Sequence, residues 1–91
     1  MKSNLIIGGG ISGLYLAYKL NTSKIILIEK SYRLGGRVYT FNKNNLNYDV
    51  GAGRISSNQN LILNLIKELK LEKKLYKIDK KKHYFLNNEY Y

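Results

Sequence analysis

The sequence predicts an α/β fold with a parallel sheet, and its N-terminal third carries the prediction. Two short apolar runs, residues 5–7 and 25–28, are continuous rather than alternating, which is typical of strands buried in a parallel sheet. Between them, Leu14, Ala17 and Tyr18 recur at helical spacing. Strand, helix and strand in this order predict a βαβ unit.

Two later segments have the pattern of β-hairpins. Residues 38–41 and 46–50 flank an Asn-rich turn at residues 42–45. Near the C-terminus, residues 84–86 and 90–91 have the same arrangement, and the second run has only two residues. We therefore expect one complete hairpin in the middle of the chain and an unfinished one at its end.

An amphipathic helix is expected between the two hairpins. Four apolar residues follow the i, i+3, i+4, i+7 pattern of one helix face: Ile62, Leu65, Ile66 and Leu69. Ser57 or Asn58 precedes this pattern and is the expected N-cap.

The chain of 91 residues carries a formal charge of +10, and half of its 16 basic residues lie between Lys67 and Lys82. Such an excess favours anionic partners. Four of these lysines share a helix-like spacing: Lys67, Lys70, Lys74 and Lys77. Because Glu68, Glu72 and Asp79 interrupt the run, we interpret it as a solvated helix face. A basic module that binds an acidic partner stays as an alternative, and nucleic acid is not an expected partner.

Several classes of function are excluded by composition. The chain has no cysteine, so it forms neither a disulfide nor a thiolate metal site, and His83 alone cannot hold a metal. No apolar run approaches the roughly 20 residues that span a bilayer. The N-terminus does not have the pattern of a signal peptide. We expect a cytoplasmic protein without a metal or a membrane partner.

The residues Gly8–Gly13 read Gly-Gly-Gly-Ile-Ser-Gly, which satisfies G-x-G-x-x-G. In this motif Gly8 permits the tight turn, Gly10 lets a pyrophosphate approach the backbone, and Gly13 lets the helix pack on the strand. The Ser12 hydroxyl could add a donor. A flexible glycine-rich turn is the alternative, but the position between a strand and a helix favours a dinucleotide site.

An acid ends the second strand, as that site requires. Glu29 lies twenty-one residues after Gly8. A carboxylate here accepts hydrogen bonds from the ribose hydroxyls of an adenosine and repels a 2′-phosphate, which favours FAD or NAD over NADP. The alternative is an ordinary solvated charge at a strand end.

Two more glycine segments follow Glu29. The sequence Arg33–Arg37 places two glycines beside Arg37, which can form charge-assisted bonds to a diphosphate. The small residues 51–53 allow a planar ring or a phosphate to pass close to the backbone. The alternatives are a basic surface loop and a strand that ends in a flexible turn.

Together, the three segments resemble the flavin-containing amine oxidase family, from Leu5 to about Lys74. The resemblance implies a partial Rossmann-like FAD/NAD(P)-binding fold with an incomplete parallel sheet. Residues 1–91 would be the N-terminal part of the FAD-binding domain, and the substrate domain would be absent. The sheet would then have an open apolar edge.

The resemblance also implies which residues bind the cofactor FAD. Those expected along its pyrophosphate are Gly8, Gly10, Ile11, Ser12 and Gly13. Glu29 would hold the adenosine ribose, followed by Lys30 where the family often has a small residue. Gly36 and Arg37 would lie against the diphosphate. Those expected beside the ribityl chain and the flavin ring are Gly51, Ala52, Gly53, Arg54 and Ile55.

The expected function is therefore that of an FAD-binding N-terminal segment of a flavin-dependent amine oxidoreductase, which binds the ADP part of FAD. Members of the family oxidise an amine and transfer hydride to FAD. We expect no catalytic residue in this chain, because the catalytic half of the family has no counterpart in it. The alternatives are an inactive truncated remnant and one part of a split protein that a second chain completes.

Overall fold

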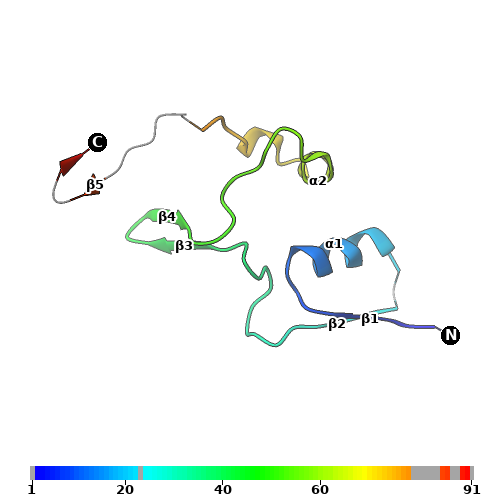
Figure 1. The fold of residues 1–91 in the computed structure, drawn as a ribbon. Helices are drawn as coiled ribbons and strands as arrows, with labels where there is room; N and C mark the ends of the chain where they lie inside the picture. Colours follow the sequence, from blue (N-terminus) through cyan, green and yellow to red (C-terminus); the bar gives the residue numbers. More distant parts are fainter. Residues whose placement is uncertain (1, 23, 79–84, 87–88, 91) are drawn as a thin grey trace. The chain divides into compact units, whose positions relative to one another are not determined.

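The computed structural model describes residues 2–22, 24–78, 85–86 and 89–90. The chain divides into two compact units, Met1–Arg54 and Ile55–Tyr91, which are described separately. The first contains a βαβ unit and a hairpin, and the second contains a helix, a 3-10 turn and a short hairpin (Figure 1).

The predicted βαβ unit is confirmed. Strands β1 (Asn4–Ile7) and β2 (Ile25–Ile28) pair in parallel, with Leu5 opposite Ile26 and Ile7 opposite Ile28. Helix α1 (Ile11–Leu20) connects them and packs along one side of the pair (Figure 1). The helix ends at Asn21, which takes the left-handed conformation with φ 42°.

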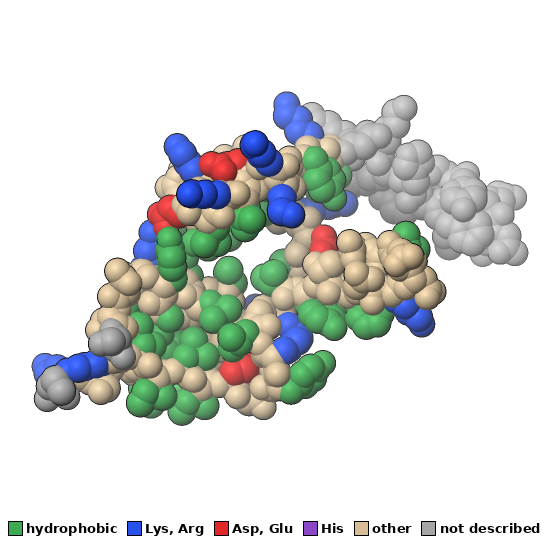
Figure 2. All heavy atoms as spheres, turned by 180° about the vertical axis from the view of Figure 1, so that it is seen from behind, with side chains coloured by type: hydrophobic (Ala, Val, Ile, Leu, Met, Phe, Trp, Pro, Cys, Tyr) green, Lys and Arg blue, Asp and Glu red, His purple; other side chains and the backbone are tan. Residues whose placement is uncertain are grey.

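The two strands are buried on one face only, so the expectation of fully buried strands is wrong for this part of the chain. Ile6 is 6% exposed, whereas Leu5 and Ile7 are 59% and 81% exposed. Ile26 and Ile28 are also more than half exposed. Successive side chains of a strand point to opposite faces, and α1 covers one of them. Figure 2 shows hydrophobic side chains on the surface of this part of the molecule.

A hairpin of β3 (Thr40–Lys43) and β4 (Leu46–Asp49) follows, but its turn is tighter than predicted. The turn consists of Asn44 and Asn45 alone, both with positive φ (53° and 61°), as in the two-residue type I′ turn. Residues 42 and 43, which we expected in the turn, belong to the first strand. The first strand also begins two residues later than predicted.

Side chains support the register of this hairpin. The rings of Phe41 and Tyr48, which face each other across the strands, stack with centroids 6.4 Å apart. The hydroxyl of Thr40 donates to Oδ1 of Asp49 at 2.7 Å. The ring stacking thus stabilises the paired strands, and the hydrogen bond stabilises the end of the hairpin away from the turn.

In the second unit, the amphipathic helix is present as α2 (Asn60–Glu68), with Leu65 buried and Leu61 71% exposed. Its N-cap is Gln59, so the prediction of Ser57 or Asn58 is wrong. The Oε1 atom of Gln59 accepts the N–H of Ser56 at 2.8 Å, and this bond closes the turn before the helix. Glutamine is not among the residues preferred at an N-cap, so the sequence did not indicate it.

Helix α2 ends in a Schellman motif. Lys70 takes φ 57°, its N–H donates to the carbonyl of Lys67, and the N–H of Leu71 donates to the carbonyl of Ile66. A short 3-10 turn, η1 (Glu72–Lys74), comes next. The basic stretch is therefore broken after Glu68, and the helix-like spacing of its lysines does not correspond to one helical face.

The C-terminal hairpin is confirmed for its described residues. Strands β5 (Phe85–Leu86) and β6 (Glu89–Tyr90) pair antiparallel. The other residues of that prediction, 84, 87–88 and 91, lie outside the described part of the chain, as does His83.

Candidate dinucleotide-binding site

The turn from β1 into α1 begins at Gly8, whose φ of 103° favours glycine. The N–H of Gly8 donates to the carbonyl of Ile28 at 2.7 Å, so the turn starts where the two parallel strands end together. This is the carboxyl edge of the sheet, the place where α/β folds bind their ligands.

The N-terminus of α1 has the features of an anion site. Gly10 is the N-cap, and its carbonyl accepts the N–H of Leu14 at 3.0 Å. No side chain caps this end within the described residues, and the first turn contains no acid. The first N–H groups of a helix have no acceptor within the helix, and the helix dipole favours a negative charge near them.

The space beside Gly10 is open. A Cβ atom added to Gly10 would meet no atom within 4 Å. Its φ of −76° and ψ of −174° are accessible to any residue. Thus the folded chain does not itself exclude a side chain here, and the open approach to the backbone suits a phosphate.

Gly13 has a different environment. A Cβ atom there would overlap the carbonyl oxygen of Gly8 and lie 3.3 Å from Cγ2 of Ile6. The absence of a side chain at Gly13 lets α1 approach β1, as the glycine motif predicts. Gly13 therefore positions the helix end on which an anion would rest.

Glu29 is fixed at the edge of the same turn. Its Oε2 accepts the N–H of Gly9 at 2.7 Å, and its Oε1 accepts the N–H of Ser31 at 3.0 Å. These backbone donors, Ser31 first and then Gly9, lower the pKa of the Glu29 carboxyl below its ordinary value. A carboxylate oxygen can accept more than one hydrogen bond, so both oxygens of Glu29 keep acceptor capacity for ribose hydroxyls.

Gly9 is a site residue that the sequence reasoning missed. It is buried, and a Cβ atom on it would lie 2.5 Å from Cδ2 of Leu34 and 3.1 Å from Oε2 of Glu29. The variable position of G-x-G-x-x-G does not predict this crowding. The useful signal in the sequence is that Gly9 is the middle one of three consecutive glycines.

The loop with Gly35 and Gly36 packs directly on the first glycine turn. The N–H of Gly35 donates to the carbonyl of Gly9 at 2.8 Å. A Cβ atom on Gly36, where φ is 56°, would come within 3.2 Å of the Cα atom of Gly10. The two glycine motifs, predicted separately to contact one diphosphate, are therefore neighbours in the structure.

The third glycine segment continues from the second. The N–H of Ala52 donates to the carbonyl of Arg37 at 2.8 Å, and a Cβ atom on Gly51 would overlap that carbonyl oxygen. The three segments thus form a continuous series of backbone contacts within the first unit. Ile55 belongs to the second unit, so its expected place beside the flavin ring stays a prediction.

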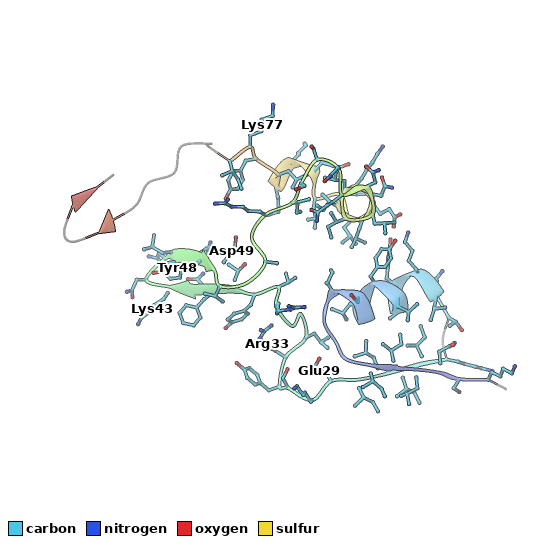
Figure 3. The ribbon with its side chains drawn as sticks, viewed as in Figure 1. Glu29, Arg33, Lys43, Tyr48, Asp49 and Lys77 are labelled. Carbon is cyan, nitrogen blue, oxygen red and sulfur yellow. The ribbon has the colours of Figure 1, made fainter. Side chains whose placement is uncertain are left out.

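The remaining expected site residues lie on the surface. Ile11, Ser12, Lys30, Gly36, Arg37 and residues 51–55 are exposed. Figure 3 shows Glu29 and Arg33 on the segment that leads from β2 to the hairpin of Tyr48 and Asp49. Exposure leaves these groups accessible to a ligand.

Two further expectations concern metals and membranes. Within the described residues, no group of three or more His, Cys, Asp or Glu side chains could hold a metal ion. Of the helices in that part of the chain, none has the length and apolar character needed to cross a membrane. The cytoplasmic location stays a prediction.

Comparison with known proteins identifies the class. Residues 11–91 match the family described as "Flavin containing amine oxidoreductase", and the chain belongs to this family. The chain is 45% identical over 78 residues to amine oxidase [flavin-containing] A from Sus scrofa, which covers 82% of this chain. It is 38% identical over 90 residues to amine oxidase [flavin-containing] B from the same organism, covering 94% of this chain. The corresponding B protein from Homo sapiens is 40% identical over 78 residues, or 82% of this chain.

These relatives are much longer than the present chain, which spans 14–17% of their length. No solved structure is significantly similar to the fold. The structure has the α/β arrangement expected of a partial FAD-binding fold, with a parallel pair of strands and one covering helix. Flavin-containing amine oxidases use FAD, which agrees with the cofactor predicted from the sequence.

Proposed function

We propose that this chain is the FAD-binding N-terminal segment of a flavin-dependent amine oxidoreductase and that it binds the ADP part of FAD. In this proposal the diphosphate lies at the N-terminus of α1, beside Gly10 and Gly36. Glu29 accepts the ribose hydroxyls of the adenosine, and Arg37 contributes a positive charge to the diphosphate. Amine oxidation is a proposal for a protein that combines this segment with a substrate domain.

The observation that carries the proposal is the environment of Gly10. The helix begins here without a side-chain cap or a first-turn acid, and the space beside the Cα atom is open. The neighbouring Gly36 turn brings a second glycine to the same place. Backbone donors, the helix dipole and the absence of side chains together fit a diphosphate better than they fit a solvated turn.

Other expected residues extend the proposed site. Gly8, Ile11, Ser12 and Gly13 form the turn and the first helical residues around the diphosphate, and Lys30 follows Glu29. Residues 51–54 lie next to Arg37, because the N–H of Ala52 donates to the Arg37 carbonyl. This contact supports a place for them further along the cofactor. With Ile55, they would lie beside the ribityl chain and the flavin ring.

Equilibrium dialysis of the purified chain against FAD tests the proposal, with the flavin absorbance as the readout. We expect saturable FAD binding that ADP competes away and that FMN, which lacks the adenosine half, does not. Gly10→Ala should weaken FAD binding at least about tenfold, because its methyl group enters the space proposed for the diphosphate. Circular dichroism checks that the variant is folded.

The same experiment separates the proposal from its main alternative, an inactive remnant of the family. A chain that is folded by circular dichroism but binds neither FAD nor ADP would support the remnant and contradict cofactor binding. The alternative of a basic module at Lys67–Lys82 has weaker support, because α2 ends at Glu68 and the described residues Lys70, Lys74 and Lys77 lie beyond the helix.

A further inference from the structure

The Arg33 side chain is bonded to the backbone of the glycine turn that follows it. Its Nη2 donates to the carbonyl of Gly36 at 2.6 Å, and its Nη1 donates to the carbonyl of Leu34 at 3.2 Å. Because these carbonyls lie on either side of Gly35, one planar guanidinium joins both ends of the turn. Arginine suits such a task, since its donors form a rigid fork.

Arg33 is itself fixed by its surroundings. The Cζ atom of its guanidinium lies 4.1 Å from the centroid of the Tyr39 ring, a cation–π contact. The hydroxyl of Ser31 donates to the carbonyl of Arg33 at 2.8 Å. Both Arg33 and Tyr39 are half-buried, so the guanidinium is held between the turn and an aromatic face.

The turn that Arg33 joins needs such support. Gly35 and Gly36 both have positive φ, 110° and 56°, and glycine loses more conformational freedom on ordering than any other residue. Yet the N–H of Gly35 donates to the carbonyl of Gly9, and Gly36 approaches Gly10. The position of this turn therefore determines the shape of the candidate diphosphate site.

The other arginine of the motif is placed differently. Arg37 is exposed, and its guanidinium makes no hydrogen bond or ion pair within the described residues. Its carbonyl, rather than its side chain, binds the next segment at Ala52. The Arg37 side chain is thus accessible to an anion, whereas the donors of Arg33 already have partners.

We infer that Arg33 is a positioning residue that holds the Gly35–Gly36 turn against Gly10 and does not itself bind the diphosphate. The inference rests on the proposed FAD binding and divides the two arginines of the motif by task. Arg33 shapes the site through hydrogen-bond geometry, and Arg37 supplies charge. A lysine at position 33 would keep the charge but lose the fork and the stacking.

Two readouts on the purified chain test this division. The first is the exchange rate of the Gly35 amide, followed by NMR without cofactor, because this N–H reports the contact with Gly9. The second is the FAD dissociation constant measured at several salt concentrations. We expect Arg33→Lys to speed Gly35 exchange and to weaken FAD binding, each about tenfold, with an unchanged salt dependence. Arg37→Gln should leave Gly35 exchange unchanged and reduce the salt dependence.

A milder variant covers the case in which Arg33→Lys does not fold. Tyr39→Leu removes the ring below the guanidinium and should change both readouts in the same direction by a smaller factor, whereas Tyr39→Phe should match the wild type. If the wild type binds FAD and Arg33→Lys binds it equally well with unchanged Gly35 exchange, the positioning role is overturned and the proposed function stands. If the folded wild type does not bind FAD, the proposed function fails and this inference fails with it.

Discussion

Substituting Gly13 by alanine adds one methyl group at the contact between α1 and β1. The added Cβ atom would overlap the carbonyl oxygen of Gly8 and lie 3.3 Å from Cγ2 of Ile6. A backbone carbonyl cannot rotate away as the end of a long side chain can. The helix must therefore shift away from the strand, and the contact that buries Ile6 weakens.

The size of the effect follows from two opposing contributions. Overpacking of this kind destabilises a protein by typically 1–3 kcal/mol, and a backbone clash belongs near about 3 kcal/mol. Alanine is a better helix former than glycine by about 1 kcal/mol. We expect Gly13→Ala to lower the free energy of unfolding by about 2 kcal/mol, a substantial part of the 5–15 kcal/mol typical of small domains.

Urea unfolding measures this change, followed by circular dichroism because the chain has no tryptophan. With a slope of about 1–2 kcal/mol per molar urea, the midpoint should fall by about 1–2 M. Gly10→Ala is the matched control, since its Cβ atom would meet no atom within 4 Å. That variant changes an N-cap glycine to a poorer cap and should lose about 1 kcal/mol or less.

The comparison of Gly13→Ala with Gly10→Ala tests whether α1 and β1 are in close contact at Gly13. A Gly13→Ala variant as stable as the wild type, or more stable than Gly10→Ala, would refute the close helix–strand contact. The two variants should rank in the opposite order for FAD binding. For the stability that each variant loses, Gly10→Ala should lose more FAD affinity than Gly13→Ala. Gly10→Ala should lose FAD binding while its fold is largely retained.

Two other predictions concern a titrating group and a helix end. Backbone donors lower the pKa of Glu29 below its ordinary value of 4.5, so its stabilising contribution is present above that value and is lost as the pH falls through the lowered one. The gap in urea midpoint between wild type and Glu29→Gln should therefore narrow between about pH 7 and about pH 3, and a constant gap would contradict this account. Lys70→Gly should raise the free energy of unfolding by about 0.5–1 kcal/mol, because Lys70 has φ 57° at the helix end. The control Lys67→Gly, inside α2, should lower it by about 1 kcal/mol, and an equal loss in both variants would exclude the left-handed end at Lys70.

Local patterns predicted the elements well, but they did not fix the boundaries. Apolar runs and helical spacing depend on a few neighbouring residues, and they located the βαβ unit and α2. The hairpin turn was predicted too long because Asn42, Asn44 and Asn45 can each adopt a left-handed conformation. Only the strand pairing selects Asn44 and Asn45. The interpretation of Lys67, Lys70, Lys74 and Lys77 as one solvated helix face was wrong for a related reason, since α2 ends at a left-handed Lys70, where glycine is the usual signal.

Burial of the strands depends on more than the strands themselves. A continuous apolar run indicates that both faces of a parallel sheet are covered, yet a covering layer has to come from elsewhere in the chain or from another chain. In the described residues, α1 supplies that layer for the face of Ile6, and Leu5 and Ile7 stay exposed on the other. The continuous apolar pattern thus indicates that these strands are suited to burial on both faces. Two strands and one helix bury only one face.

The site residues were predicted one motif at a time, and the contacts between motifs were not predictable in this way. Glu29 was expected at the ribose, but its bond to the N–H of Gly9 depends on how a turn twenty residues earlier is placed. The backbone hydrogen bonds of the Arg33 side chain were also missed, although the motif contains two arginines. Sequence spacing places both beside the glycines. Only the hydrogen bonds to Leu34 and Gly36 show that one of them is already engaged with the backbone.

The proposed cofactor site is best supported by the contrast between two glycines of the same motif, Gly10 at the N-cap of α1 and Gly13 within the helix. Gly13 needs no ligand to explain it, since the folded chain leaves no room for a side chain there. Gly10 has backbone angles that any residue adopts and open space where a Cβ would lie, so packing does not require glycine at that position. Glycine is acceptable as an N-cap, but it offers no side-chain acceptor to the helix end. An anion that occupies this space would satisfy those N–H groups and would also exclude a side chain, which accounts for both features at once.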